Sequence, residues 1–119
     1  MNQPEVRFVN LTRNPIEIVH QDERIAKIPL SGVIARLREE PDRTIKAGGI
    51  PLTYSIFALP DCLPTPSDGV IYVVPMAVAL VGAAGGRPDL AFPSGFVKDR
   101  TGKPIGARRL VVVSSILHK

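Results

Sequence analysis

Few side chains in this sequence could carry covalent or metal chemistry. The only cysteine is Cys62, and the two histidines, His20 and His118, lie far apart in the chain. These three residues are too few for a Cys/His zinc site, which takes four ligands. Cys62 and His20 could in principle act as a nucleophile and its base, but the proline-rich surroundings of Cys62 favour a partly buried structural thiol. We therefore expect no catalytic residue, no metal and no cofactor.

The sequence also lacks the motifs by which many enzymes bind phosphates or activate a nucleophile. It contains no GxSxG, P-loop, GxGxxG or HExxH pattern. Gly85-Gly86-Arg87 has the composition of a phosphate loop, but it follows an expected helix, so the helix dipole is unfavourable for an anion. We interpret these residues as a helix C-cap, and we expect a protein that is not an enzyme.

Arginine supplies the strongest binding chemistry in the chain. Ten of the 15 basic residues are arginine, whose guanidinium binds phosphate or carboxylate through paired hydrogen bonds. Arg108 and Arg109 are neighbours on an apolar strand, so they point to opposite faces, and one of them should lie half-buried at the rim of an apolar surface. A half-buried arginine needs an anionic partner. That partner could be Glu5, Glu17 or Asp99, a neighbouring subunit, or a bound phosphate.

Polar turn residues are the other groups able to hold an anion. We predict a ligand site that combines arginines with one polar turn and a strand tyrosine. Its expected members are Asn10, Thr12, Asn14, Arg36, Tyr72, Arg108 and Arg109. The expected ligand is a small anion of nucleotide type.

The most apolar stretch, residues 68–93, organises the expected fold. Residues 70–74 are β-branched and aromatic, which predicts a buried strand. Pro75 suits the first position of a helix because it lacks an N–H, and the residues from 76 onward continue as a short helix that is apolar on every side. The glycines that can end this helix in a left-handed C-cap are Gly82, Gly85 and Gly86.

Short alternating runs elsewhere predict strands separated by turns. We expect them at residues 5–10, 16–19, 24–28, 33–38, 44–46, 50–59, 90–92, 96–98 and 104–113. The first two flank an Asn/Pro turn, which predicts a hairpin or a tight corner. Residues 39–43 should form a charged loop, and the run at 50–59 could pair with residues from either Arg36 or Thr44 onward.

The end of the chain should form a hairpin whose second strand is central in a sheet. Residues 99–103 have the composition of a hairpin loop. The final strand is apolar on both faces, so it should have neighbours on both sides or be covered by a partner chain. Together these elements predict a β-dominated α+β fold, a single domain over residues 1–119 made of short antiparallel strands with one short buried helix.

Composition limits the partners of the chain. A net charge of +4 allows an anionic partner, but the basic residues are dispersed and no aromatic–basic stripe is present, so we do not expect a nucleic-acid partner. Residues 70–84 are too few to cross a bilayer, which takes about 20 residues, and we find no signal-peptide pattern. We expect no membrane contact and a cytoplasmic location.

The apolar helix also predicts self-association. Residues 76–84 have no polar face, and such a helix must be covered on all sides, which a domain of this size achieves with difficulty. The apolar strand at 111–113 adds surface that needs a cover. We therefore expect a homo-oligomer.

Several segments resemble a family of small, uncharacterised proteins from bacteria and tailed phages. The family is recognisable by an N-terminal Asn-Leu-Thr-Pro-His-Pro-Ile motif, which corresponds to residues 10–16 here, with Arg13-Asn14 in place of Pro-His. Further similar segments are residues 31–36, 49–51, 69–75, 87–89, 97–99 and 105–110, where Pro75 replaces a serine of the family. The resemblance implies a phage or bacterial cytoplasmic setting and carries no catalytic assignment.

We therefore expect a non-enzymatic binding protein, such as a phage anti-defence protein that sequesters a nucleotide-type signalling molecule. The alternative is a structural or protein-interaction module of phage or bacterial origin that has no small-molecule ligand. Sequestration requires a pocket lined by arginine and polar turns. A structural role requires an extended surface instead.

Overall fold

The structure is a computed structural model that describes residues 5–21 and 23–116. Strands make up 51% of the chain and a single short helix 8%, which confirms the β-dominated α+β class. The elements are β1 (Arg7–Asn10), β2 (Ile16–His20), β3 (Glu23–Ile28), β4 (Arg38–Ala47), β5 (Ile50–Ala58), β6 (Val70–Val73), α1 (Met76–Ala84), β7 (Leu90–Lys98) and β8 (Pro104–Val112).

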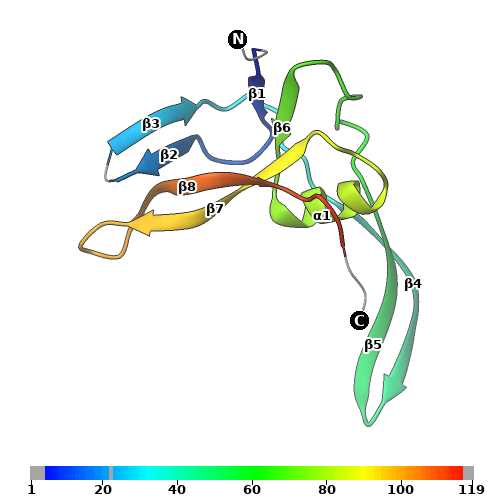
Figure 1. Cartoon of the computed structure of the whole chain (residues 1–119). Helices are drawn as coiled ribbons and strands as arrows, with labels where there is room; N and C mark the ends of the chain where they lie inside the picture. Colours follow the sequence, from blue (N-terminus) through cyan, green and yellow to red (C-terminus); the bar gives the residue numbers. More distant parts are fainter. Residues whose placement is uncertain (1–4, 22, 117–119) are drawn as a thin grey trace.

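Six of the strands form one mixed sheet in the order β1-β6-β7-β8-β2-β3. The pairs β1–β6, β6–β7 and β2–β8 are parallel, and β7–β8 and β2–β3 are antiparallel hairpins. A parallel bridge between Asn10 and Leu30 connects the end of β1 to the residues just after β3. β1 and β3 are the two outer strands of this sheet. The bridge therefore brings the two edges of the sheet together at one end, and the sheet is curled (Figure 1).

Two cores lie on the two faces of β6, as alternation along a strand requires. Tyr72 and Val74 face α1 in a cluster whose other members are Leu11, Ala35, Val78, Ala79 and Leu90. Val73 points to the opposite face, where it packs with Ile16, Ile18, Ile28 and Ala107. β8 lies between β7 and β2, so the prediction of a central final strand is confirmed.

The helix begins where expected and is covered on one side only. Pro75 caps its N-terminus and Gly85 its C-terminus, so Gly82, a predicted end, lies inside the helix, where a methyl group would collide with Leu90. Val78 and Ala79 are buried, but Met76 is 56% and Leu80 40% exposed. The helix is therefore not buried on every side within this chain.

The predicted turn after β1 is a corner and not a hairpin, because β1 pairs with β6 instead of β2. Asn10 is only 1% exposed and makes this corner. Its side-chain oxygen accepts hydrogen bonds from the backbone N–H and the hydroxyl of Thr12, at 2.9 and 2.6 Å. Its amide donates to the carbonyls of Asn14 (2.9 Å) and Ile28 (3.3 Å). These bonds hold the chain in the bend that leads to β2.

Two predicted boundaries in the middle of the chain are wrong. Residues 33–37 are not a strand, and the expected charged loop at 39–43 belongs to β4. β4 passes Pro41, which cannot donate to a ladder, through a register shift between Pro41 and Arg43. The paired strands meet at Gly48-Gly49, whose positive φ angles of 59° and 79° suit a two-residue hairpin turn.

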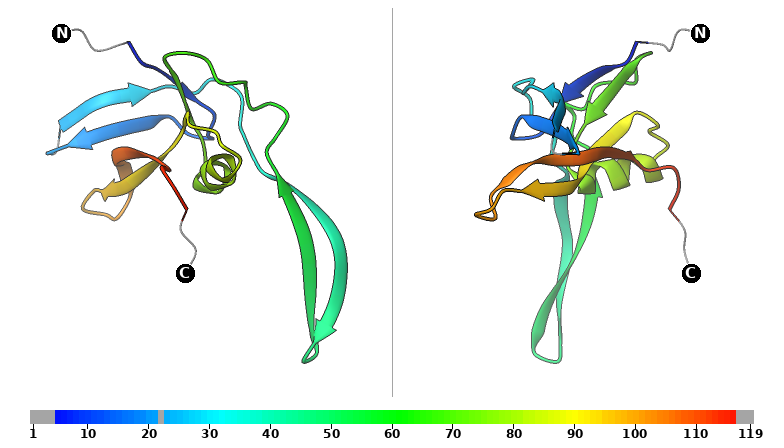
Figure 2. Two further views of the ribbon diagram at one scale, coloured as in Figure 1. Left: turned by 45° about the vertical axis from the view of Figure 1, so that its right-hand side comes forward. Right: turned by 60° about the vertical axis from the view of Figure 1, so that its left-hand side comes forward.

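β4 and β5 form a separate two-stranded sheet, which we term the arm (residues 38–58). Figures 1 and 2 show the arm extending away from the curled sheet and past α1. Every residue of β4 is exposed, and none of β5 is buried. The arm gives the chain a radius of gyration of 17.3 Å, compared with about 13.5 Å expected for a compact domain of this length.

Candidate ligand-binding groove

A groove of about 1140 Å³ opens where three parts of the fold meet. These parts are the corner between β1 and β2, the N-terminus of α1, and the β7–β8 hairpin. Its apolar lining includes Val74, Pro75, Met76, Phe92 and Ile105. The groove therefore offers an apolar surface large enough for a ring system, bounded by polar segments.

The charged side chains that line the groove are mostly cationic. They are Arg13, Lys27, Arg36 and Lys103, all exposed, and one carboxylate, Glu17. Glu17 already accepts a hydrogen bond from Arg24 at 3.1 Å, and Arg24 is not part of the lining. None of the four cations forms an ion pair with an acid in the described part of the chain. This excess of positive charge favours an anionic ligand.

Three of the seven predicted site residues line the groove, namely Thr12, Asn14 and Arg36. Asn10 does not line the groove, but its hydrogen bonds hold Thr12 and the carbonyl of Asn14. The polar corner therefore forms one wall of the groove, and its role in binding a ligand stays a prediction. Within that wall Asn10 is a positioning residue, since its side chain is occupied by the corner itself.

The other three predicted residues lie elsewhere. Tyr72 is buried in the core against α1. Arg108 and Arg109 do not line the groove, and both are exposed, so the expectation of a half-buried arginine on β8 is wrong. On the neighbouring strand they lie near Gly95, where a side chain would meet both Arg108 and the Arg109 guanidinium.

The sequence did not predict Arg13, Lys27 or Lys103 as site residues. Arg13 has a local signal, since it stands between Thr12 and Asn14 in the same corner. Lys27 on β3 and Lys103 before β8 have no such local signal in the sequence. Only the order of the strands in the sheet brings them to the groove. The aromatic lining residues Phe92 and Phe96 lie on β7, which pairs with β8 in a local hairpin, but nothing in their spacing marks them as site residues.

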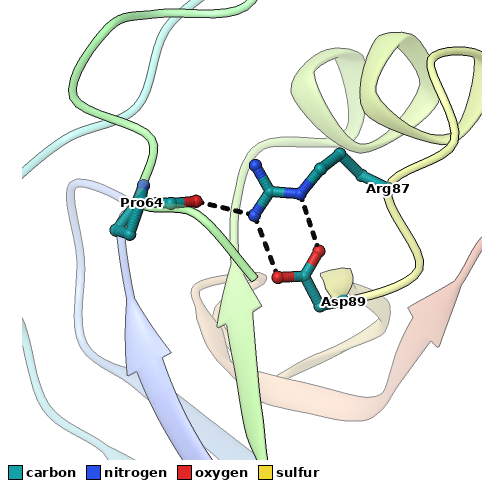
Figure 3. A network of polar contacts seen from close by, with 3 residues as sticks. All are labelled: Pro64, Arg87 and Asp89. Atoms are coloured by element: carbon teal, nitrogen blue, oxygen red, sulfur yellow. Dashed lines mark hydrogen bonds and ion pairs between the residues drawn. The ribbon is translucent and has the colours of Figure 1, made fainter. Parts of the chain in front are cut away.

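The Gly-Gly-Arg segment is a structural anchor, as its interpretation as a C-cap requires. Arg87 donates two hydrogen bonds of 2.9 Å to the carboxylate of Asp89 and one of 2.8 Å to the carbonyl of Pro64 (Figure 3). The hydrogen bond to Asp89 raises the pKa of Arg87 above its usual value, although burial acts against it. These contacts assign Arg87 a structural role, since its Nε and Nη2 groups hold Asp89 and the proline-rich loop.

The described residues offer few groups for metal or thiol chemistry. Within residues 5–21 and 23–116, no three His, Cys, Asp or Glu side chains lie together. Cys62 is exposed, which corrects the expectation of a partly buried thiol. Its loop runs over the surface, where the thiol lies 3.7 Å from the carbonyl of Ile34. His118 lies outside the described residues.

In the part of the chain that the structure describes, no helix combines the length and the apolar character needed to cross a membrane. Comparisons with models of protein families, with curated proteins and with solved structures gave no match. The function of this chain therefore has to be argued from its own side chains.

Proposed function

We propose that this protein binds a small anionic ligand of nucleotide type in the groove and holds it without changing it chemically. The observation that carries this proposal is the set of four cations, unpaired with any described acid, around an apolar lining. Phosphate oxygens need the cations, and a base or sugar ring needs the apolar surface. A nucleotide carries both features in one molecule.

The positions of the cations suit a ligand with separated charges. Arg13 and Arg36 come from the corner and from the segment before the arm, and Lys103 comes from the β7–β8 hairpin. Arginine can bind a phosphate through two parallel hydrogen bonds, and lysine adds a point charge. The volume of about 1140 Å³ is slightly larger than most small-molecule sites, which reach about 1,000 Å³. This size favours a dinucleotide or a cyclic nucleotide derivative over a single phosphate ion.

Binding of this kind fits the sequestration of a nucleotide signal. A protein that holds such a signal tightly lowers its free concentration without any catalytic group. In the phage or bacterial cytoplasm that the family resemblance implies, sequestration would protect the phage from a defence system that the signal activates.

A thermal-shift screen followed by mass spectrometry tests this function. The probes are inorganic phosphate, mononucleotides, cyclic dinucleotides and cyclic ADP-ribose. We expect at least one nucleotide to raise the melting temperature more than phosphate does, and heating to release it with its mass unchanged. Release of an altered product would indicate an enzyme, and the absence of stabilisation by every nucleotide would contradict the proposal.

A structural or protein-interaction role is the second candidate, and the arm favours it. A projecting hairpin with exposed apolar side chains has no evident use in holding a small ligand. It is typical of a surface that contacts another protein.

A further inference from the structure

The chain exposes more surface than a folded monomer of its size should. Its accessible surface is 8953 Å², whereas a compact monomer of this mass exposes about 6300 Å². The difference of about 2700 Å² is comparable to the area that stable protein–protein interfaces bury. The chain therefore has the surface of a subunit that is incomplete by itself.

The arm is amphipathic, and its more apolar face is largely exposed, although the Arg43 guanidinium lies 4.6 Å from the centre of the Tyr54 ring. Strand alternation and the β4–β5 register put Ile45, Ile50, Leu52, Tyr54 and Ile56 on one face, and these side chains are 42% to 62% exposed. The opposite face carries more polar side chains, with Thr44 hydrogen-bonded to Thr53 at 3.0 Å and Ser55 to Glu39 at 2.7 Å, although the register also places Pro51 and the exposed Phe57 on it. A two-stranded hairpin alone is marginally stable in water, so the apolar face needs a partner.

A second uncovered apolar surface lies on the face of the curled sheet that is turned away from α1. Here a hollow of about 380 Å³ is lined by eight residues, all apolar: Phe8, Ile18, Ala26, Ile28, Ile71, Ala91, Leu110 and Val112. Phe8 is 44% and Val112 48% exposed. We term this surface the sheet hollow.

We propose that the arm of one copy packs its apolar face onto the sheet hollow of a second copy. The arm extends away from the sheet in every view (Figures 1 and 2), and its strands pair only with each other, so the arm does not cover the hollow of its own chain. Each copy therefore presents one donor surface and one acceptor surface. Both surfaces are apolar and exposed, and each can cover the other.

Such a contact is head-to-tail, because the two surfaces that meet are different. Repeated from copy to copy it produces a closed ring or an open filament. Every internal copy then buries both surfaces, which lowers the exposed apolar area of each chain. The sheet hollow and the ligand groove share no lining residue, so this association does not depend on ligand binding.

Substitutions on the two faces of the arm test the donor surface. We expect the unmodified chain at tens of micromolar to be oligomeric by light scattering, and Leu52→Lys to have the mass of one chain. Thr53→Lys is the matched control, since it puts the same charge at the next position, on the polar face. It should keep the oligomer. A monomeric unmodified chain, or equal masses for the two variants, would overturn the proposal.

Mixing two defective variants tests the head-to-tail pairing. Val112→Lys in the sheet hollow should also give a monomer, with Phe8→Lys as a second variant, and circular dichroism selects the one that remains folded. Mixed in equal amounts with Leu52→Lys, it should form a complex of two chains and nothing larger, because only one intact donor and one intact acceptor remain. A mixture that stays monomeric would refute the pairing. A sheet-hollow variant that still oligomerises would show that arms pack against arms.

Discussion

Asn10 is the side chain on which the polar wall of the groove depends. It is nearly fully buried and uses its oxygen and its amide to hold four groups of the corner and of β3. This places Arg13 and Thr12 at the groove without any contact between Asn10 and a ligand. A buried amide that satisfies this many partners is costly to remove, because each group left unpaired loses its hydrogen bond.

Replacement of Asn10 by alanine should therefore lower the free energy of unfolding by about 2 kcal/mol. Asn14→Ala is the control, because the hydrogen bonds at Asn14 use its backbone carbonyl and its side chain is exposed. It should change stability little. Urea unfolding of both variants makes the comparison. Equal stability of the two would show that the Asn10 side chain does not hold the corner.

The loop at residues 99–103 should respond to acid through Asp99. Hydrogen bonds lower the pKa of Asp99, first from the Thr101 hydroxyl and then from the Lys103 N–H. Because the pKa is lower in the folded state, the stabilisation is present above the unfolded pKa and is lost as the pH falls through the folded pKa. Thr101→Ala should raise the pKa of Asp99 in an NMR titration. An Asp99 that titrates like an unstructured aspartate would contradict this account.

At the scale of elements, the Arg87–Asp89 pair ties the long proline-rich loop to the segment between α1 and β7. Arg87 bonds both Asp89 and the carbonyl of Pro64, and the pair is largely buried. The pair between Arg24 and Glu17 has similar chemistry, but it lies on the exposed face of the β2–β3 hairpin. Removal of Arg87 leaves the Asp89 carboxylate unpaired in a buried site, which is costly. Removal of Arg24 leaves Glu17 accessible to water, so the second ion pair should contribute less to stability.

Arg87→Ala should lower the free energy of unfolding by about 3 kcal/mol, and Arg24→Ala by less than about 1 kcal/mol. Thermal and urea unfolding measure both. A similar small effect of the two substitutions would mean that the proline-rich loop is held by its apolar contacts alone.

The elements that the sequence predicted well are those with local signals. Pro75 and Gly85 delimit α1, and residues 99–103 form the hairpin loop, as composition indicated. The parallel pairing of β1 with β6 has no such signal, because it joins residues some 60 positions apart. The strand through Pro41 was also missed, since a proline among charged residues is typical of a loop and only the partner strand β5 holds it extended.

At the scale of the whole molecule, the groove is a product of this long-range pairing, whereas the arm is a local hairpin. The four groove cations come from four separate segments, and the sheet order brings them together. The prediction of a homo-oligomer stays a proposal, and the uncovered arm and sheet hollow support it. The proposed ligand groove and the proposed sheet-hollow surface share no lining residue, so the two proposals can be tested independently.

The measurement that tests the central claim most directly is the affinity of the best nucleotide from the screen for two arginine variants. In isothermal titration calorimetry, Arg36→Ala should weaken binding about 10- to 100-fold, as the loss of a charge-assisted contact implies. Arg108→Ala removes the same charge from an exposed position outside the groove and should change affinity less than about 3-fold. Both variants should melt near the temperature of the unmodified protein. Equal affinities for the two variants would contradict the assignment of the groove as the ligand site.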